Sequence, residues 1–263
     1  MRALKLVGCF IRTSLQEEAA YRANFWISLF YSVLNLGSGV LGIVVLFGQV
    51  ESVQGWTLPS TLALLGVYLC VTALRGLFIG PGLDSLAGMD GEIWSGTFDF
   101  TLLRPVNTQL LVSVRKWRLF SLADLLMAAA VLVTAVMMLG VTLTAWQVAA
   151  FILTLLAAVL ILYAFLLAFA ALVFWSPGVM FTWVFDGLFQ LARYPMGMYP
   201  GWLQLVLTWV IPVGLITTVP AQALTGTISW AALAVSLGAA LILVAAASIL
   251  FRIGLRRYAS ASS

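Results

Sequence analysis

Residues 146–174, WQVAAFILTLLAAVLILYAFLLAFAALVF, decide the fold because they carry no charged side chain. The run exceeds the roughly 20 apolar residues that an α-helix needs to cross a bilayer. Similar apolar runs fill most of the rest of the chain, at 24–47, 61–79, 119–143 and 230–251. The 263 residues are 63% hydrophobic and only 8% charged, whereas soluble domains are roughly 45–50% apolar and ~25% charged. The sequence therefore predicts an all-α membrane protein, with residues 1–263 forming one membrane domain.

The first 22 residues have the pattern of an amphipathic helix rather than of a membrane span. One face of this helix would carry four apolar residues and another face three polar ones: Leu4, Val7, Ile11 and Leu15 against Lys5, Arg12 and Gln16. Such a helix is expected to lie in the membrane interface. Glu17 and Glu18 precede any long apolar stretch, which disfavours a cleaved secretory signal and indicates mature protein.

The region that follows residue 177 is less regular. Residues 178–191 would cover only about 21 Å as an α-helix, less than the hydrocarbon core of a bilayer, so they form a short or tilted span at best. The next apolar stretch, 202–219, is interrupted by Pro212 and Gly214. Backbone that enters the membrane without crossing it must line a cavity or a protein interface. We therefore expect a re-entrant hairpin within residues 194–225.

The positions of the cations predict the orientation of the chain in the membrane. All of the 13 Lys and Arg residues except Arg193 lie within 1–22, 75–118 or after residue 251. Because cytoplasmic loops carry an excess of Lys and Arg, both termini and residues 80–118 are expected in the cytoplasm, with Glu51 and Arg193 outside. Six spans and a re-entrant hairpin satisfy this rule, whereas seven spans would place one cation cluster outside.

The cytoplasmic segment 89–105, MDGEIWSGTFDFTLLRP, joins acidic residues and glycines with the aromatics Trp94, Phe98 and Phe100. Aromatic anchors with a polar rim are typical of protein–protein contacts. The segment is therefore either a coupling element that fits a cytosolic motor protein or a loop folded back on its own membrane domain. The residues expected to contribute to coupling are Asp90, Glu92, Trp94, Phe98, Asp99 and Arg104.

Three stretches of the chain resemble the permease subunits of the ABC-2 exporter family. They are YRANFWIS at 21–28, GEIWSGTFDFTLLRPVNTQL at 91–110 and ARYPMGMYPGWLQLVLTWVIPVGLITTVPAQAL at 192–224. The resemblance implies an interfacial N-terminal helix, six transmembrane helices, a coupling helix between the second and third, and re-entrant helices before the sixth. It also implies a prokaryotic cytoplasmic membrane, two ATPase subunits and a second permease, identical or related. The chain has no G-x-x-x-x-G-K-[ST] loop, so ATP and Mg²⁺ are expected on a separate ATPase.

Two carboxylates fall within apolar runs, Asp124 and Asp186. Ionisable groups inside a membrane are costly and often functional, so each is a candidate substrate contact or a polar lock between helices. Asp124 also lies near the cytoplasmic end of its span, where it could instead meet Arg118 or water. The scarcity of charge in the apolar runs argues for an amphiphilic substrate.

Three other classes of protein fit the sequence less well. A secondary transporter would be expected to show broken helices in both halves of the chain, but only one half is broken here. An intramembrane enzyme would need a nucleophile and base or a metal cluster, whereas histidine is absent and Cys9 and Cys70 offer no ligand spacing. We therefore expect a non-catalytic chain without a cofactor of its own, and a membrane scaffold remains the residual alternative.

Overall fold

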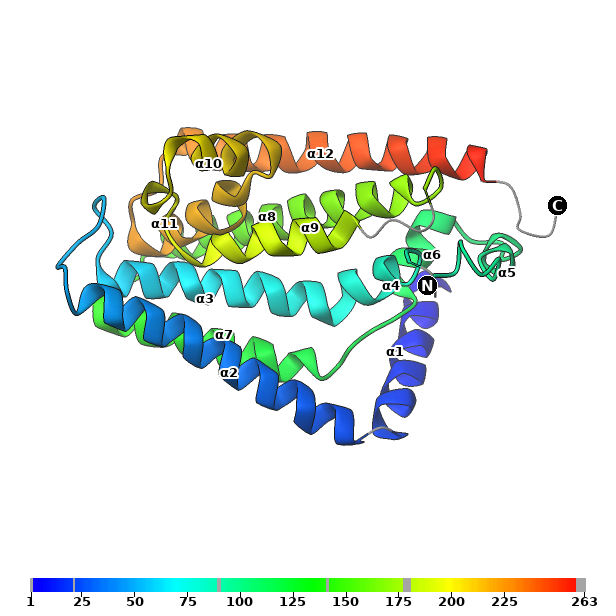
Figure 1. Cartoon of the computed structure of the whole chain (residues 1–263), viewed down its shortest axis with the longest axis horizontal. Coiled ribbons are helices and arrows are strands. Elements are labelled where there is room, and N and C mark those ends of the chain that lie inside the picture. The colour runs from blue at the N-terminus through cyan, green and yellow to red at the C-terminus, as the bar shows by residue number, and fades with distance from the viewer. Residues whose placement is uncertain (1, 21, 89–90, 141, 177–180, 259–263) are drawn as a thin grey trace.

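The computed structural model describes residues 2–20, 22–88, 91–140, 142–176 and 181–258, and this part of the chain is helical without a β-strand. Five of the described helices are long and apolar enough to cross a membrane. They run side by side (Figure 1) as α2 (Arg22–Phe47), α3 (Leu58–Leu74), α7 (Ser121–Leu139), α8 (Ala145–Leu172) and α12 (Trp230–Arg257). The all-α membrane fold expected from the apolar runs is therefore confirmed, with five long spans at the expected places.

Local sequence signals begin and end these helices. The hydroxyl of Thr144 accepts a hydrogen bond from the Gln147 backbone N–H, and the Gln147 side chain accepts one from the Thr144 backbone N–H at 2.8 Å. This reciprocal pair satisfies N–H groups that have no partner inside the helix, so α8 begins at Ala145. Helix α7 ends where Gly140 adopts φ +63°, a left-handed conformation that suits glycine. Although only a short connection separates α7 from α8 along the chain, α7 packs on α3 and α8 packs on α12.

Helices α3 and α8 form the centre of the bundle. Helix α3 packs on α7, α8 packs on α12, and α3 and α8 contact each other. Gly66 allows the α3–α7 contact, because a Cβ atom there would lie 2.8 Å from the Leu132 side chain. The buried residues of α8 include many alanines, which lets neighbouring backbones approach closely.

The two ends of the bundle differ in composition and shape. At one end lie both termini, the short helices α4 (Gly80–Asp84), α5 (Asp99–Leu102) and α6 (Thr108–Val114), and α1 (Arg2–Ala20), which runs across the direction of the long helices (Figure 1). Most of the cations belong to this end. The opposite end holds the 48–57 loop together with α10 (Gly201–Leu205) and α11 (Val219–Thr225).

Hydrogen bonds attach α1 to the segment that leads into α7. The Ser14 hydroxyl accepts from the Trp117 backbone N–H at 3.2 Å, and the Glu18 carboxylate accepts from the Leu119 backbone N–H at 3.1 Å. Burial raises the pKa of Glu18, while the backbone N–H groups of Phe120 and Leu119 and the charge of Arg118 oppose the rise. The N-terminal helix is thus tied to the bundle by Ser14 and Glu18, which share a face with Val7 and Ile11, while Arg12 and Gln16 stay exposed.

The irregular region contains α9 (Phe181–Phe189), a 3₁₀ turn at Gln190–Arg193, another at Met196–Met198, and π-helical turns at Val206–Val210 and Gly214–Thr218. Helix α9 has nine residues, fewer than a complete crossing requires. It packs against neighbours on both sides, since Phe185 stacks on Phe165 of α8 at 5.7 Å and Phe189 lies 5.4 Å from Tyr68 of α3. The chain reverses at Ile211, in extended conformation, before α11 packs on α8 and α3.

Candidate functional site

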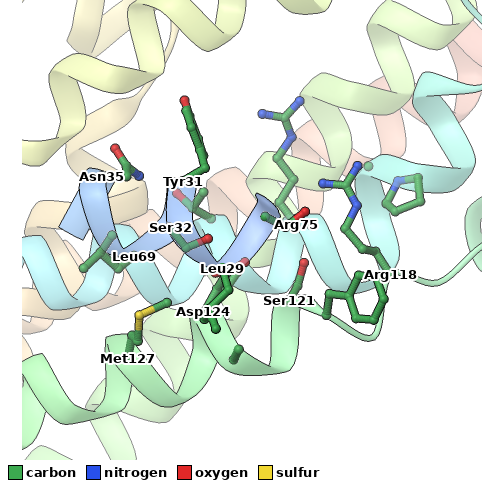
Figure 2. A pocket seen from close by; sticks show the side chains of 18 of the residues that line it. Leu29, Tyr31, Ser32, Asn35, Leu69, Arg75, Arg118, Ser121, Asp124 and Met127 are labelled. Carbon is green, nitrogen blue, oxygen red and sulfur yellow. The ribbon is translucent and has the colours of Figure 1, made fainter. Parts of the chain in front are cut away.

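A cavity of about 890 Å³ opens between α2, α3, α4, α7 and α9. The N-terminal half of α2 and the first turns of α7 contribute to it, so it lies in the half of the bundle nearest α1 and α4 (Figure 2). From the sequence, few fixed charges are expected inside the bundle. The structure instead gathers five ionisable side chains on the wall of this cavity: Arg75, Asp84, Arg118, Asp124 and Asp186.

Arg75 and Asp186 form an ion pair across the cavity wall. Both terminal nitrogens of the Arg75 guanidinium donate to the carboxylate, Nη2 to Oδ2 at 3.2 Å. Asp84 adds a second carboxylate 3.8 Å from Nη2. The Arg75 side chain is only 16% exposed, so this group depends on its partners to offset lost hydration. Arg75 begins the π-helical turn Arg75–Ile79 that separates α3 from α4.

Asp124 lines the same cavity but has no such partner. It lies in the first turn of α7 and is half-buried. No ion pair or hydrogen bond joins its carboxylate to any side chain that the structure describes, including Arg118, the partner considered from the sequence. Asp124 therefore presents an unpaired carboxylate to the cavity.

Arg193 contacts the cavity wall through Asn35. From the sequence, Arg193 is expected outside the membrane, but the structure folds its side chain against α2 and α3. Its Nη2 donates to Asn35 Oδ1 at 2.6 Å, and its guanidinium lies 5.3 Å from the ring centre of Tyr68, a cation–π contact. Asn35 lies midway along α2 and lines the cavity. A lone arginine in the apolar half of the chain was the sequence signal that could have suggested such a site.

The segment 91–105, which the sequence places in the cytoplasm, folds partly onto the bundle. Phe98 is fully buried (0% exposed), with its ring 5.6 Å from Phe174 and 5.3 Å from Tyr258. Glu92 pairs with Arg115 and lies 3.6 Å from Lys116. Both residues were expected to face a partner protein, but in this structure their side chains are engaged within the chain. The reason is that residues 91–102 turn back toward the ends of α8 and α12, which the sequence does not reveal.

Other residues of the segment point outward. Trp94 is 56% exposed, Phe100 69% and Leu103 79%, and Arg104 is also exposed. Asp99 begins α5 and lies near Tyr258, where burial and the Asp99 carboxylate raise the pKa of the tyrosine to about 12. Asp90 lies outside the described residues.

A comparison with known protein families identifies the chain. The family model described as "ABC-2 family transporter protein" matches residues 33–262. The chain belongs to the ABC-2 transporter family. No curated protein and no solved structure matches it. Membership makes this chain a membrane transport permease, and permeases of the family are typically non-catalytic subunits.

A polar network in this ABC-2 permease joins α6 to the long helices. Gln109 of α6 donates from Nε2 to the Tyr163 hydroxyl of α8 at 3.2 Å and to the Ser248 hydroxyl of α12 at 2.9 Å. Ser113 adds a 3.0 Å contact with Tyr163. A force applied to α6 can therefore reach two long helices through hydrogen bonds. Sequence reasoning missed this network because a polar residue in a cytosolic segment is usually solvated.

The permease offers little for metal chemistry in the part of the chain that the structure describes. No group of three or more Cys, Asp or Glu side chains there is arranged to hold a metal ion. Of the two cysteines, Cys9 is exposed and Cys70 is buried, and both are free. The candidate site therefore consists of a charged cavity and an exposed apolar surface in the 91–105 segment.

Proposed function

We propose that this permease is the membrane subunit of an ATP-driven exporter whose ATPase is a separate protein. The exposed apolar surface formed by Trp94, Phe100 and Leu103, termed here the docking surface, carries the proposal. The ATPase, with ATP and Mg²⁺, would bind there and drive the export of an amphiphilic substrate. The assembly would contain two ATPase subunits and a second permease, identical or related, in the cytoplasmic membrane of a prokaryote.

The docking surface has the composition of a partner site. Two aromatic residues and one aliphatic residue are exposed in the same segment as the charged Arg104, and large exposed anchors with a polar rim dominate binding energy at many interfaces. The same segment is anchored to the bundle, because Phe98 is buried against Phe174 and Tyr258, which directly follow α8 and α12. Gln109 then connects the same region to those two helices. This arrangement supports its use as a coupling element.

The irregular region supports a sixth crossing of the membrane. Asp186 meets Arg75 near the cytoplasmic end of α3, Arg193 meets Tyr68 further along α3, and Gly197 lies against Gln54 of the opposite loop. The chain therefore advances from one end of the bundle toward the other within a dozen residues. A 3₁₀ turn rises about 2.0 Å per residue, more than an α-helix, so a short segment covers more distance. We propose α10 to α11 as the re-entrant hairpin.

Cysteine labelling in intact cells tests this topology. In a Cys9→Ser background, Ser52→Cys and Thr227→Cys should react with a membrane-impermeant maleimide, because both positions are exposed at the end of the bundle opposite α1. Ser95→Cys, exposed in the cytosolic segment, should react only after permeabilisation. A Thr227→Cys protein that reacts only in permeabilised cells would contradict the sixth crossing.

Purification tests the division of labour between subunits. The tagged permease should copurify with an ATP-binding cassette protein from its native membrane, and the complex should release phosphate from ATP. The permease alone should not, because it lacks a phosphate-binding loop. The control is a complex in which the P-loop lysine of the ATPase is replaced. Substrate movement that continues without any ATPase would instead indicate a secondary transporter, and absence of both a partner and transport would favour a scaffold.

A further inference from the structure

The charges of the cavity do not balance. Its described wall carries two guanidinium groups and three carboxylates: Arg75 and Arg118 against Asp84, Asp124 and Asp186. Such a cavity has an excess of one negative charge. Charges inside a membrane protein interact more strongly than charges in water, so this imbalance favours a cation over an anion.

Arg75 is already paired with carboxylates, and Arg118 acts on other carboxylates electrostatically. Arg75 is held by Asp186 and approached by Asp84. Arg118 lies close enough to Glu18 to oppose the rise in the pKa of that carboxyl group. Asp124 is left without a partner among the described side chains, and an uncompensated carboxylate between helices is costly. A bound cation at Asp124 would remove that cost.

The rest of the cavity wall suits a ligand that has an apolar body and a cationic head group. Leu29 lies beside Asp124 in the close view of the cavity (Figure 2), and Met127 and Leu69 line the same wall. The rings of Phe25 and Phe120, with centroids 5.0 Å apart, line the same space. Aromatic rings attract quaternary and protonated amines through their faces. A volume of about 890 Å³ also falls within the range of small-molecule sites, roughly 300–1,000 Å³.

We propose that this cavity binds a cationic amphiphile, with its amine against Asp124 and its apolar body along α2, α3 and α7. The proposal that this amphiphile is the exported substrate rests on the function proposed above. Binding itself does not need the ATPase. Asp124 would then be the residue that selects a positive head group over a negative one.

A binding experiment on the full chain tests the proposal. The permease, in nanodiscs of phosphatidylcholine, is titrated with the fluorescent cation rhodamine 6G, and fluorescence anisotropy reports binding. Dodecyltrimethylammonium and dodecyl sulfate, which share a tail and differ in charge, are then compared as competitors below their micelle concentrations. We expect dodecyltrimethylammonium to displace the probe at a concentration about tenfold below that needed for dodecyl sulfate, given the strength of contacts to charged groups. A larger difference would also support the proposal. Equal or better displacement by dodecyl sulfate would overturn the proposal.

Variants place the binding at Asp124. Asp124→Asn should raise the Kd for rhodamine 6G about tenfold, and Met127→Trp should weaken binding by filling the cavity. Glu51→Gln removes the same charge from an exposed loop and should leave the Kd unchanged. An unchanged Kd in a folded Asp124→Asn protein would refute the assignment. Should that variant not fold, Asp124→Glu must retain binding, and the competition on the unaltered chain decides independently. If rhodamine 6G does not bind at Asp124 but the ATPase copurifies, only the proposed ligand class is overturned. If rhodamine 6G binds at Asp124 but no ATPase copurifies, only the proposed exporter function is overturned.

Discussion

Replacing Arg75 with methionine should destabilise the permease by about 3 kcal/mol, because it leaves the carboxylates of Asp84 and Asp186 in the cavity wall without their cation. Asp186 loses both of its hydrogen bonds from Arg75, and Asp84 loses its only described cation within 4 Å. We expect a loss of unfolding free energy at the lower end of the range for buried ion pairs, because the Asp186 side chain is 37% exposed. The measurement is the free energy of unfolding in detergent micelles.

A double variant separates the loss of the pair from the loss of packing. Arg75→Met with Asp186→Leu removes both charges, so it should be more stable than Arg75→Met alone by about 1 kcal/mol or more. Asp186→Asn alone should cost less than Arg75→Met, because Arg75 keeps Asp84 as a partner. If the double variant were as unstable as the sum of the two single changes, the ion pair would not be the source of the stability.

Trp94→Ala should abolish most ATPase copurification while the permease stays folded. Trp94 is more than half exposed and has no role in the core. Truncating an aromatic anchor at an interface costs roughly 2 kcal/mol or more, which is about a 30-fold loss of affinity. Phe100→Ala should weaken the same contact, since its ring is also exposed. The measurement is the amount of ATPase recovered per permease, with Trp202→Ala, exposed at the opposite end of the bundle, as the matched control.

Phe98→Ala should behave differently, although Phe98 is close to Trp94 in sequence. Its ring is buried against Phe174 and Tyr258, so truncation should leave a cavity and lower stability by about 3 kcal/mol. The melting temperature of the permease without its ATPase should therefore fall for Phe98→Ala and stay unchanged for Trp94→Ala. If Trp94→Ala and Phe100→Ala retained full assembly and coupled transport, the segment would be only a loop packed on its own membrane domain.

The positions of the long helices follow from the sequence because the length of an apolar run is a local property. Each run expected at 24–47, 61–79, 119–143, 146–174 and 230–251 corresponds to a long helix or helical span, with boundaries set by local signals such as the Thr144 cap and Gly140. The sequence also predicted that 178–191 is too short for a complete straight crossing, because an α-helix of this length does not span the hydrocarbon core. The extension of α3 through a π-helical turn into α4 was not predicted, since Gly80 and Pro81 read as a helix end.

The site residues depended on contacts that sequence patterns do not contain. The partner of Asp186 is 111 residues away, and the partner of Arg193 is 158 residues away. Glu92 and Phe98 read as exposed because they lie in a polar segment, yet that segment folds back and engages both.

The sequence alone determined the class of the protein, its long spans, its cation asymmetry and its family resemblance, since composition and apolar length suffice for these. Only the tertiary structure decided which charges compensate one another, which aromatics face outward and where the cavity lies. The physical reason is that these properties depend on how helices pack across the bundle. Asp124 is the clearest case, because its residue type is visible in the sequence while its lack of a described partner emerges only once every neighbouring helix is in place.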